Sequence, residues 1–294
     1  MKIPYLSIII TTRNEELNIL RCLESISAAD LKCYARSGLF SEIIIVDNFS
    51  TDRTISISEK FRSGLGGRDN SLRIIQSGPE RSAQRNTGIK NAGAEYILYL
   101  DADMTISEDL LIELFQKYII PQREVAVYIP EHIPGDRFWS RLRHFERSFY
   151  NATVIDAVRF FPKKIFMLAG GFPETMTAGE DWFLDRKIRK LTGTSVSTGF
   201  ICHHEKSGIT AWFKKKYYYA EDFRYYLEKS AGEAEIKKQF GFYYRFFGVF
   251  TENGKWQQAV QKPHYLLCIF FLKIITGFFF YIKNIKILHK KSDN

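Results

Sequence analysis

Residues 97–103, Ile-Leu-Tyr-Leu-Asp-Ala-Asp, form an apolar run that ends in two acidic residues. A continuous apolar run of this length is typical of a strand that is covered on both faces of a sheet. Four more runs of this kind lie at residues 6–12, 43–47, 72–76 and 125–129. Together, these runs predict the strands of a central, buried sheet.

Amphipathic segments separate the runs and are expected to form helices, at residues 15–27, 51–61 and 81–92. The repeated strand–helix–strand order predicts an α/β fold, with a single doubly wound, mostly parallel sheet flanked by helices. In such sheets, ligands bind at the carboxyl ends of the strands. Polar residues follow three of the predicted strands, at 11–15, 47–52 and 101–103. The sequence therefore places its carboxylates where a binding crevice is expected.

Asp101 and Asp103 are the first candidates for a metal site. Strand alternation would put both carboxylates on the same side, with the small Ala102 opposite. Two carboxylates make a hard oxygen site for Mg²⁺ or Mn²⁺, which completes its shell with phosphate and water. Such a metal would act as a Lewis acid on a departing diphosphate. An Asp-x-Asp pair also arises by chance, and a surface turn is the alternative.

The order of the polar motifs resembles that of family-2 glycosyltransferases with the GT-A fold. The matching segments are residues 7–16, 42–52, 83–89, 100–103, 170–174 and 179–182. The resemblance covers roughly residues 5–205. It implies a nucleotide-sugar site formed by Thr11, Arg13, Glu15, Asp47, Arg85, Asp101, Ala102 and Asp103.

Several roles follow from the resemblance. Asp47 would accept a hydrogen bond from the base, as an ionised carboxylate can. Arg85 would face the diphosphate, which an arginine fork suits, although a helical arginine on the surface is the alternative. Asp181 would be the general base that removes the acceptor proton, and Glu180 would position the acceptor. Acids at this point would also complement the dipole of a helix that begins there, and the two roles are compatible.

His203 and His204 are further candidates for metal or diphosphate contact. The resemblance implies that a histidine beyond the Glu-Asp pair can complete the site, and neutral imidazole is a suitable ligand. Residues 195–202 would be the strand that delivers it. The pair could equally do no more than end that strand, and the sequence does not separate the two histidines.

Composition limits the remaining classes. The chain has 294 residues, a net charge of +9 and 15% aromatic residues, so anionic partners are expected. Four scattered cysteines favour a reducing cytosol, and the N-terminus lacks the pattern of a signal peptide. We expect residues 1–210 to form the catalytic domain and residues 211–294 a helical, aromatic and basic appendage that associates with a membrane.

Two segments carry the membrane prediction. In residues 138–149, Phe138, Leu142, Phe145 and Phe149 form an apolar helical stripe, and the arginines on its other faces are either solvated or contact a charged acceptor or lipid. Residues 265–282 are apolar except for Lys273 and Thr276, and Lys273 would be costly at the centre of a bilayer. Three arrangements of residues 265–282 remain open: a helix that lies in the headgroup region, a single membrane-spanning helix, and a helix that packs within the protein or at an oligomer interface.

The expected enzyme is a metal-dependent, inverting glycosyltransferase that moves a sugar from a UDP- or GDP-linked donor to a hydroxyl of a lipid-linked or cell-surface glycan. It is expected at the cytoplasmic side of the cell membrane, as a peripheral or monotopic protein on an anionic surface. No Gln-x-x-Arg-Trp motif is present, so transfer of single sugars is favoured. A sugar nucleotidyltransferase is the alternative, but residues 11–15 lack the glycines of its phosphate loop. A catalytically silent membrane scaffold is a second alternative. No nucleic-acid partner is expected, and the sequence leaves the oligomeric state open.

Overall fold

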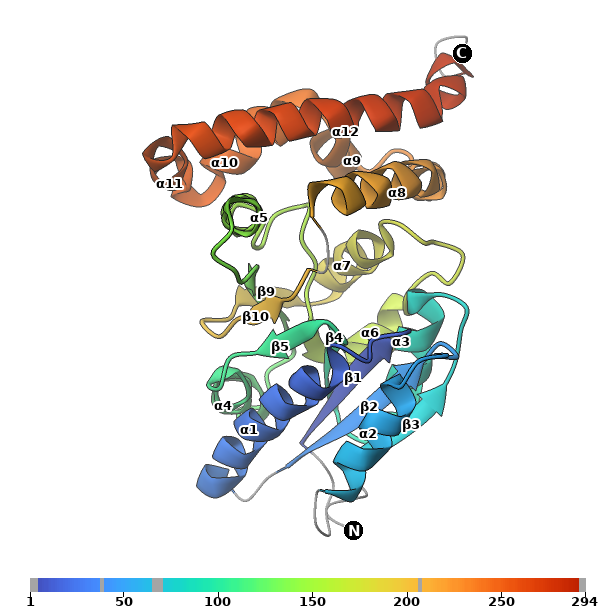
Figure 1. Cartoon of the computed structure of the whole chain (residues 1–294), viewed down its shortest axis with the longest axis vertical. Helices are drawn as coiled ribbons and strands as arrows, with labels where there is room; N and C mark the ends of the chain where they lie inside the picture. The colour runs from blue at the N-terminus through green and yellow to red at the C-terminus, as the bar shows by residue number, and fades with distance from the viewer. Residues whose placement is uncertain (1–4, 38–39, 65–70, 206–207, 291–294) are drawn as a thin grey trace.

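The computed structural model describes residues 5–37, 40–64, 71–205 and 208–290. A seven-stranded sheet forms its centre, in the order β3-β2-β1-β4-β8-β6-β9 (Figure 1). All adjacent strands are parallel except where β8 pairs with β4 and β6. The strands are β1 (Leu6–Thr12), β2 (Ser41–Asp47), β3 (Leu72–Gln76), β4 (Tyr96–Asp101), β6 (Val125–Tyr128), β8 (Phe160–Pro162) and β9 (Gly193–Val196). The predicted mostly parallel sheet and its five early strands are confirmed.

The pairing register brings the polar strand ends together. Thr12 of β1 pairs with Asp47 of β2, and Thr11 pairs with Asp101 of β4. Because these three strands are parallel, their carboxyl ends lie at one edge of the sheet. Asp101 is the last residue of β4, and residues 102–103 form a turn. The strand alternation that predicted a shared side for the two aspartates therefore does not extend to Asp103.

Helices cover both faces of the sheet. On one face, α1 (Ile19–Ser37) and α4 (Leu110–Leu114) pack against alternate residues of β1, β2 and β4. The other face is covered by α3 (Arg81–Lys90), α6 (Lys163–Ala169) and α7 (Glu180–Leu191); α2 (Thr54–Ser63) packs beside α1. Helix α1 begins later and ends ten residues beyond the predicted 15–27, because Ala29 and Cys33 continue its buried stripe.

A second, three-stranded sheet lies beside the first, in the order β5 (Met104–Ile106), β10 (Ile201–His203) and β7 (Glu131–His132). The single strand predicted at residues 195–202 is wrong, since β9 and β10 belong to different sheets. Between them, the backbone N–H groups of Thr198 and Gly199 donate to the buried carboxylate of Glu113 instead of to a neighbouring strand. That carboxylate ends β9 and turns the chain toward the small sheet.

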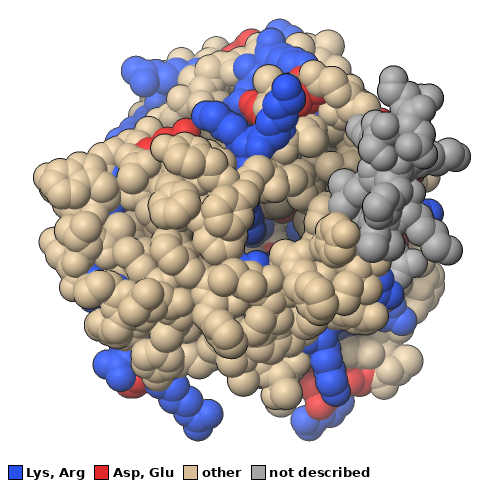
Figure 2. Space-filling view, turned by 90° about the horizontal axis from the view of Figure 1, so that it is seen from above, with Lys and Arg blue, Asp and Glu red and all other residues tan. Residues whose placement is uncertain are grey.

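The C-terminal part is helical: α8 (Ile209–Lys229), α9 (Ala234–Phe240), a π-helical turn at Tyr244–Gly248, α10 (Val249–Thr251), a 3₁₀ turn at Glu252–Gly254, α11 (Trp256–Gln261) and α12 (Pro263–Lys290). Helix α12 crosses the top of the molecule (Figure 1). Seen from above, this face is mostly free of charge, and lysine and arginine side chains gather at its edges (Figure 2).

Helix α5 (Phe138–Ser148) joins the C-terminal helices to the rest of the chain. Its residues Leu142 and Phe145, with Phe149 just beyond it, pack into a third core with α12 residues Tyr265 and Ile269. The predicted apolar stripe is confirmed at these three positions, whereas Phe138, its first member, is 52% exposed. The basic side is not simply solvated, because Arg143 and Arg147 are largely buried and paired with carboxylates. The boundary at residues 210 and 211 stays a prediction; α8 begins at Ile209.

Candidate active site

Asp101 lies at the centre of the polar edge of the sheet. Its Oδ1 accepts hydrogen bonds from Thr11 Oγ1 at 2.9 Å and from Arg85 Nη2 at 3.0 Å. Although burial opposes ionisation, the charges of Arg85 and Arg81 hold the pKa of Asp101 well below its ordinary value. Asp101 is therefore a carboxylate at neutral pH. Ala102 is buried beside it, and its backbone N–H donates to the Thr11 carbonyl.

Arg85 connects two acidic groups from distant parts of the sequence. Its residue exposure is 3%, and its guanidinium lies 3.0 Å from Asp101 and 3.3 Å from Glu180. The rings of Tyr99 and Phe172 flank it, at 4.9 and 5.2 Å from ring centroid to guanidinium carbon. A helical surface arginine, the alternative considered from the sequence, is therefore wrong. Contact of Arg85 with a diphosphate stays a prediction.

Arg81 is a candidate that the sequence analysis missed. It lies one helical turn before Arg85, 3.8 Å from Glu180, and 39% of its side chain is exposed. A guanidinium with one exposed side can bind an anionic ligand, whereas the buried Arg85 is already enclosed by protein. The spacing of the two arginines, at i and i+4 on α3, is the sequence signal that could have identified this cluster.

Glu180 and Asp181 occupy the first turn of α7, as the dipole argument predicted. Burial, together with repulsion from Asp181, raises the pKa of Glu180 to about 7. Asp181 is half-buried, and its Oδ1 accepts from the Trp182 backbone N–H at 2.9 Å. The turn begins at Gly179, where φ is +79° and a Cβ would come within 2.9 Å of the Tyr226 ring. This tight entry fixes where the two acids lie.

His203 and Asp103 meet beside the small sheet. Nε2 of His203 lies 3.2 Å from Asp103 Oδ2, and Nδ1 lies 2.8 Å from Glu131 Oε1. His204 instead contacts Thr105 Oγ1, at 3.0 Å from Nε2. The structure thus separates the two imidazoles: that of His203 lies beside the Asp103 carboxylate, whereas His204 contacts Asp103 only through its backbone N–H, which donates to the Asp103 carbonyl. Burial opposes its protonation, but the hydrogen bonds to Asp103 and Glu131 raise the pKa of His203 to about 10.

Asp103 and His203 are the candidate ligands for a divalent metal. Within the described ranges, no group of three or more His, Cys, Asp or Glu side chains is arranged to hold a metal ion. Asp103 and His203 are nevertheless partly exposed, at 22% and 15% of their side chains, and they offer one oxygen and one nitrogen ligand. Such a small donor set fits a metal that takes its other ligands from phosphate and water.

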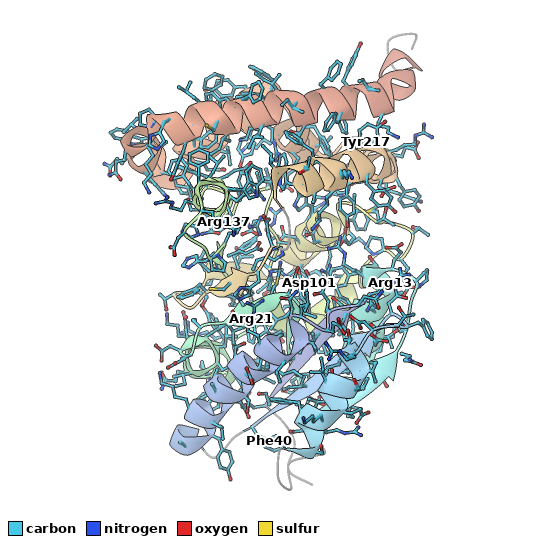
Figure 3. All side chains as sticks on the ribbon, in the orientation of Figure 1. Arg13, Arg21, Phe40, Asp101, Arg137 and Tyr217 are labelled. Carbon is cyan, nitrogen blue, oxygen red and sulfur yellow. The ribbon has the colours of Figure 1, made fainter. Side chains whose placement is uncertain are left out.

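The loops after β1 and β2 lie at the same polar edge of the sheet. The backbone N–H of Asn14 donates to Ser50 Oγ at 2.9 Å, and that of Thr51 donates to Asn14 Oδ1 at 2.8 Å, so the two loops hold each other. Arg13 is exposed, and Figure 3 shows it with Asp101 along the upper edge of the sheet. Glu15 is half-buried in the same loop.

Asp47 is fully buried in this structure. Its carboxylate accepts hydrogen bonds from the backbone N–H and the hydroxyl of Ser50. Contact between Asp47 and a nucleotide base would therefore require Ser50 to move, and this role stays a prediction. The contacts of Thr11, Arg13 and Glu15 with a nucleotide are likewise predictions.

Replacing Arg85 by methionine should lower the free energy of unfolding by about 3–5 kcal/mol, because Asp101 and Glu180 would lose a buried charge partner. Arg53 supplies the control: it pairs with Glu16, 76% of its side chain is exposed, and Arg53→Met should cost about 0–1 kcal/mol. Urea denaturation of the wild type and both variants measures the difference. Equal losses for the two variants would mean that the buried ion pairs of Arg85 contribute no more to the free energy of unfolding than the exposed pair of Arg53.

Comparison with known proteins gives the family. Residues 7–190 match the model of glycosyl transferase family 2. The chain belongs to this family. Over 126 residues it is 30% identical to the poly(ribitol-phosphate) β-N-acetylglucosaminyltransferase TarS of Staphylococcus aureus, covering 43% of this chain and 19% of TarS. Over 212 residues it is 31% identical to the glycosyltransferase GlyA of Streptococcus pneumoniae serotype 4, covering 64% of this chain and 28% of GlyA. The chain thus spans less than a third of both relatives.

Solved structures confirm the GT-A fold of this family-2 chain. Residues 1–349 of TarS, in complex with UDP-GlcNAc, superpose with a TM-score of 0.53 at 17% identity, over 90% of this chain and 79% of that one. The mannosyltransferase PcManGT from Pyrobaculum calidifontis, in complex with GDP-Man and Mn²⁺, gives 0.55 at 23% identity, over 76% and 64%.

Proposed function

We propose that this glycosyltransferase moves a sugar from a nucleoside diphosphate, UDP or GDP, to a hydroxyl of a lipid-linked or cell-surface glycan, with inversion at the anomeric carbon. One observation carries the proposal: Arg85 joins Asp101, at the strand ends where a donor would bind, to Glu180, beside the acid proposed as base. The structural neighbours complexed with UDP-GlcNAc and GDP-Man support this donor class.

Each side of the crevice has a proposed part in donor binding. Thr11, Glu15 and Asp47 would line the nucleotide pocket, and Arg13 would reach it from its exposed position. The half-exposed Arg81 is the arginine best placed to meet the diphosphate, with Arg85 behind it holding Asp101. Asp101, Ala102 and Asp103 would contact the donor sugar and the phosphates.

A divalent cation, Mn²⁺ or Mg²⁺, fits the donor set of Asp103 and His203, with Asp101 near the sugar. When bound, such an ion stabilises negative charge on the departing diphosphate, so that no protein acid need protonate it. The Mn²⁺ in the PcManGT complex supports this assignment. Of the two histidines, His203 is the proposed ligand, because its imidazole lies beside the Asp103 carboxylate, whereas the imidazole of His204 contacts Thr105.

The protein groups can then perform a single displacement. Asp181 accepts the proton of the acceptor hydroxyl while its oxygen forms a bond to the anomeric carbon. The bond from that carbon to the diphosphate oxygen breaks on the opposite face, and the nucleoside diphosphate leaves with the electron pair. Glu180, held by Arg81 and Arg85, would position the acceptor next to Asp181.

The identity of the released product tests this function. Incubation with UDP- and GDP-sugars should release free nucleoside diphosphate, and an added acceptor should accelerate the release. A sugar nucleotidyltransferase would instead form nucleoside triphosphate when pyrophosphate is added. A silent scaffold would release neither product. Chromatography of the nucleotides distinguishes the three outcomes.

Helix α12 supports attachment to a membrane surface. Within the described helices, only Pro263–Lys283 is long and apolar enough to cross a membrane, which is weak evidence alone. Its inner side, with Tyr265, Ile269 and Leu272, is buried in the third core. The outer side is an exposed apolar stripe, which we call the α12 stripe: Leu267, Phe271, Ile274 and Phe278, with 59–70% of each residue exposed.

Lys273 turns away from this stripe. It is 6% exposed, its ammonium donates to the Arg245 carbonyl, and it lies 4.3 Å from the centroid of the Phe250 ring. The charge that the sequence suggested would be costly in a bilayer is therefore held inside the protein. Because α12 also packs against α5 and α8, an interfacial position explains the exposed stripe better than a separate spanning helix.

A groove beside the α12 stripe supports a lipid-linked acceptor. Its volume is about 700 Å³. Eight of the nine residues that line it are uncharged: Phe138, Trp139, Leu142, Ile209, Leu267, Cys268, Phe271 and Leu272. Arg137 is the ninth. Leu267 and Phe271 belong to both the groove and the stripe, so a hydrocarbon chain could pass from the bilayer into the groove, with its phosphate near Arg137.

Replacing Phe271, Ile274 and Phe278 together by serine should weaken binding to anionic liposomes by about 100-fold, since each side chain contributes about 1 kcal/mol on leaving water. Nucleotide binding should be unchanged. These substitutions are preferable to deleting α12, whose inner side belongs to a core. The control replaces three exposed leucines of the catalytic part, Leu20, Leu31 and Leu168, by serine.

Liposome flotation measures both triple variants, with and without anionic lipid. High salt should also weaken the wild-type interaction, because lysines near an anionic surface are screened. Unchanged flotation of the α12 variant would mean that another part of the chain attaches to the membrane. If the wild type did not float with liposomes, the α12 stripe would instead be a contact surface for another protein.

A further inference from the structure

Glu131 contacts His203 from the side opposite Asp103. It is the first residue of β7, is 6% exposed, and accepts a hydrogen bond from His203 Nδ1 at 2.8 Å. The small sheet creates this contact: β10 ends at His203 and lies between β5, which follows Asp103, and β7, which begins at Glu131. Three residues that are far apart in the sequence thus form a row, Asp103–His203–Glu131.

The other oxygen of Glu131 has separate partners. Its Oε2 accepts from Arg147 Nη2 at 2.9 Å and from Arg159 Nη2 at 3.4 Å. Each carboxylate oxygen is therefore committed, Oε2 to two guanidinium groups and Oε1 to the imidazole. The arginines fix the rotation of the carboxylate, and the carboxylate in turn fixes the plane of the His203 ring.

We propose that Glu131 is a positioning residue, which holds His203 in the one tautomer and orientation that can bind a metal beside Asp103. The inference rests on the proposed metal site. To act as a ligand, Nε2 must release the proton that it donates to Asp103 and present a lone pair to the metal, which leaves the remaining proton on Nδ1. A carboxylate accepts hydrogen bonds and cannot donate them, so Glu131 stabilises this arrangement and excludes the opposite tautomer.

Glu131→Gln is the informative substitution because it keeps the size of the side chain. The two arginines can only donate, so they would retain the amide oxygen of the new side chain. Its NH₂ group would then point at Nδ1 and require a lone pair there. The proton would move to Nε2, which faces Asp103, and the ring could no longer bind a metal at that atom. Loss of such an outer partner lowers metal affinity by about 10–100-fold.

Asp156 provides a matched control. It is buried, accepts from Arg147 at 3.2 Å and from the Ala152 backbone N–H at 2.9 Å, and has no hydrogen bond to His203. Asp156→Asn would turn an NH₂ group toward either Arg147 or the Ala152 N–H, so it disturbs a buried partner of the same arginine as Glu131→Gln does, without touching the imidazole. An effect that came from the buried ion pairs alone would appear in both variants.

The experiment measures the affinity of the 294-residue chain for Mn²⁺ in the presence of UDP or GDP, by electron paramagnetic resonance of free Mn²⁺. Metal-free nucleotide binding is the second measurement. Glu131→Gln should weaken Mn²⁺ binding by about 10–100-fold, and His203→Ala should do the same. The double variant should lose no more than the single ones, and metal-free nucleotide binding should persist. Asp156→Asn should retain the wild-type Mn²⁺ affinity.

Each contrary result has a distinct meaning. Wild-type Mn²⁺ affinity in Glu131→Gln, with loss in His203→Ala, would overturn the role of Glu131 and leave the metal site intact. Wild-type affinity in His203→Ala would overturn the metal assignment itself. An equal loss in Asp156→Asn would assign the effect to the arginine pairs. If Glu131→Gln does not fold, Glu131→Asp keeps the charge and withdraws the carboxylate from Nδ1; unchanged Mn²⁺ affinity in that variant would overturn the proposal.

Discussion

Asp181→Asn should lower kcat by about 10²-fold or more, because an amide cannot accept the acceptor proton. Nucleotide binding should stay close to that of the wild type, since Asp181 lies on α7 and not on the strand ends proposed to hold the donor. The half-buried position of Asp181 lets it meet an acceptor, whereas Glu180 beside it is 4% exposed and enclosed by Arg81 and Arg85.

Two variants accompany this measurement. Glu180→Gln should act more on the KM for acceptor than on kcat, as expected of a group that positions the acceptor. Asp185→Asn changes another acid on the same helix, which accepts from the Val158 backbone N–H and from Arg189, and it should leave kcat nearly unchanged. Steady-state kinetics with varied acceptor separate these effects. Transfer by Asp181→Asn at the wild-type rate would assign the base to another residue.

Removal of the divalent cation should have an effect of similar size. Chelation should reduce donor turnover by about 10²-fold or more, because charge on the leaving diphosphate would then be stabilised by arginines alone. Added Mn²⁺ or Mg²⁺ should restore the wild type, whereas Asp103→Ala should stay inactive with added metal. Release of nucleoside diphosphate, followed with and without chelator, provides the measurement.

Glu108→Ala is the control for Asp103→Ala. Glu108 follows β5, 77% of its side chain is exposed, and it pairs with Lys32 at the surface. Its replacement should leave both the activity and the metal requirement unchanged. Full activity of the wild type in chelator would remove the metal from the mechanism, and an active Asp103→Ala variant would remove Asp103 from the metal site.

The sequence predicted the sheet well because each central strand is a continuous apolar run. Residues such as Ile8, Ile44 and Leu98 are fully buried, because helices cover both faces of the sheet. An apolar run of this kind is expected only in a strand that is covered on both faces. The polar residues that follow these runs must then meet at one edge. That argument located Asp47 and Asp101 correctly, and the acids at the start of α7 were placed correctly by their position before an apolar stretch.

What the sequence did not predict depends on contacts between distant segments. Glu131 begins a two-residue strand, and only its pairing with β10 brings it beside His203. The burial of Arg85 depends on Phe172 and Glu180, which lie more than eighty residues further along the chain. Lys273 looked like a charge in a membrane helix, because nothing in its own segment indicates that Arg245 and Phe250 enclose it.

The most direct test of the central claim is thermal denaturation of the wild-type protein with nucleoside diphosphates. A ligand that binds only the folded state stabilises it by about 2.7 kcal/mol at a hundredfold excess over Kd. We expect UDP or GDP to raise Tm clearly in the presence of Mn²⁺, to raise it less without metal, and to show no benefit from Mn²⁺ in Asp103→Ala. If no nucleoside diphosphate raised Tm at millimolar concentration with Mn²⁺, the crevice at the ends of β1, β2 and β4 would not be a sugar-nucleotide site.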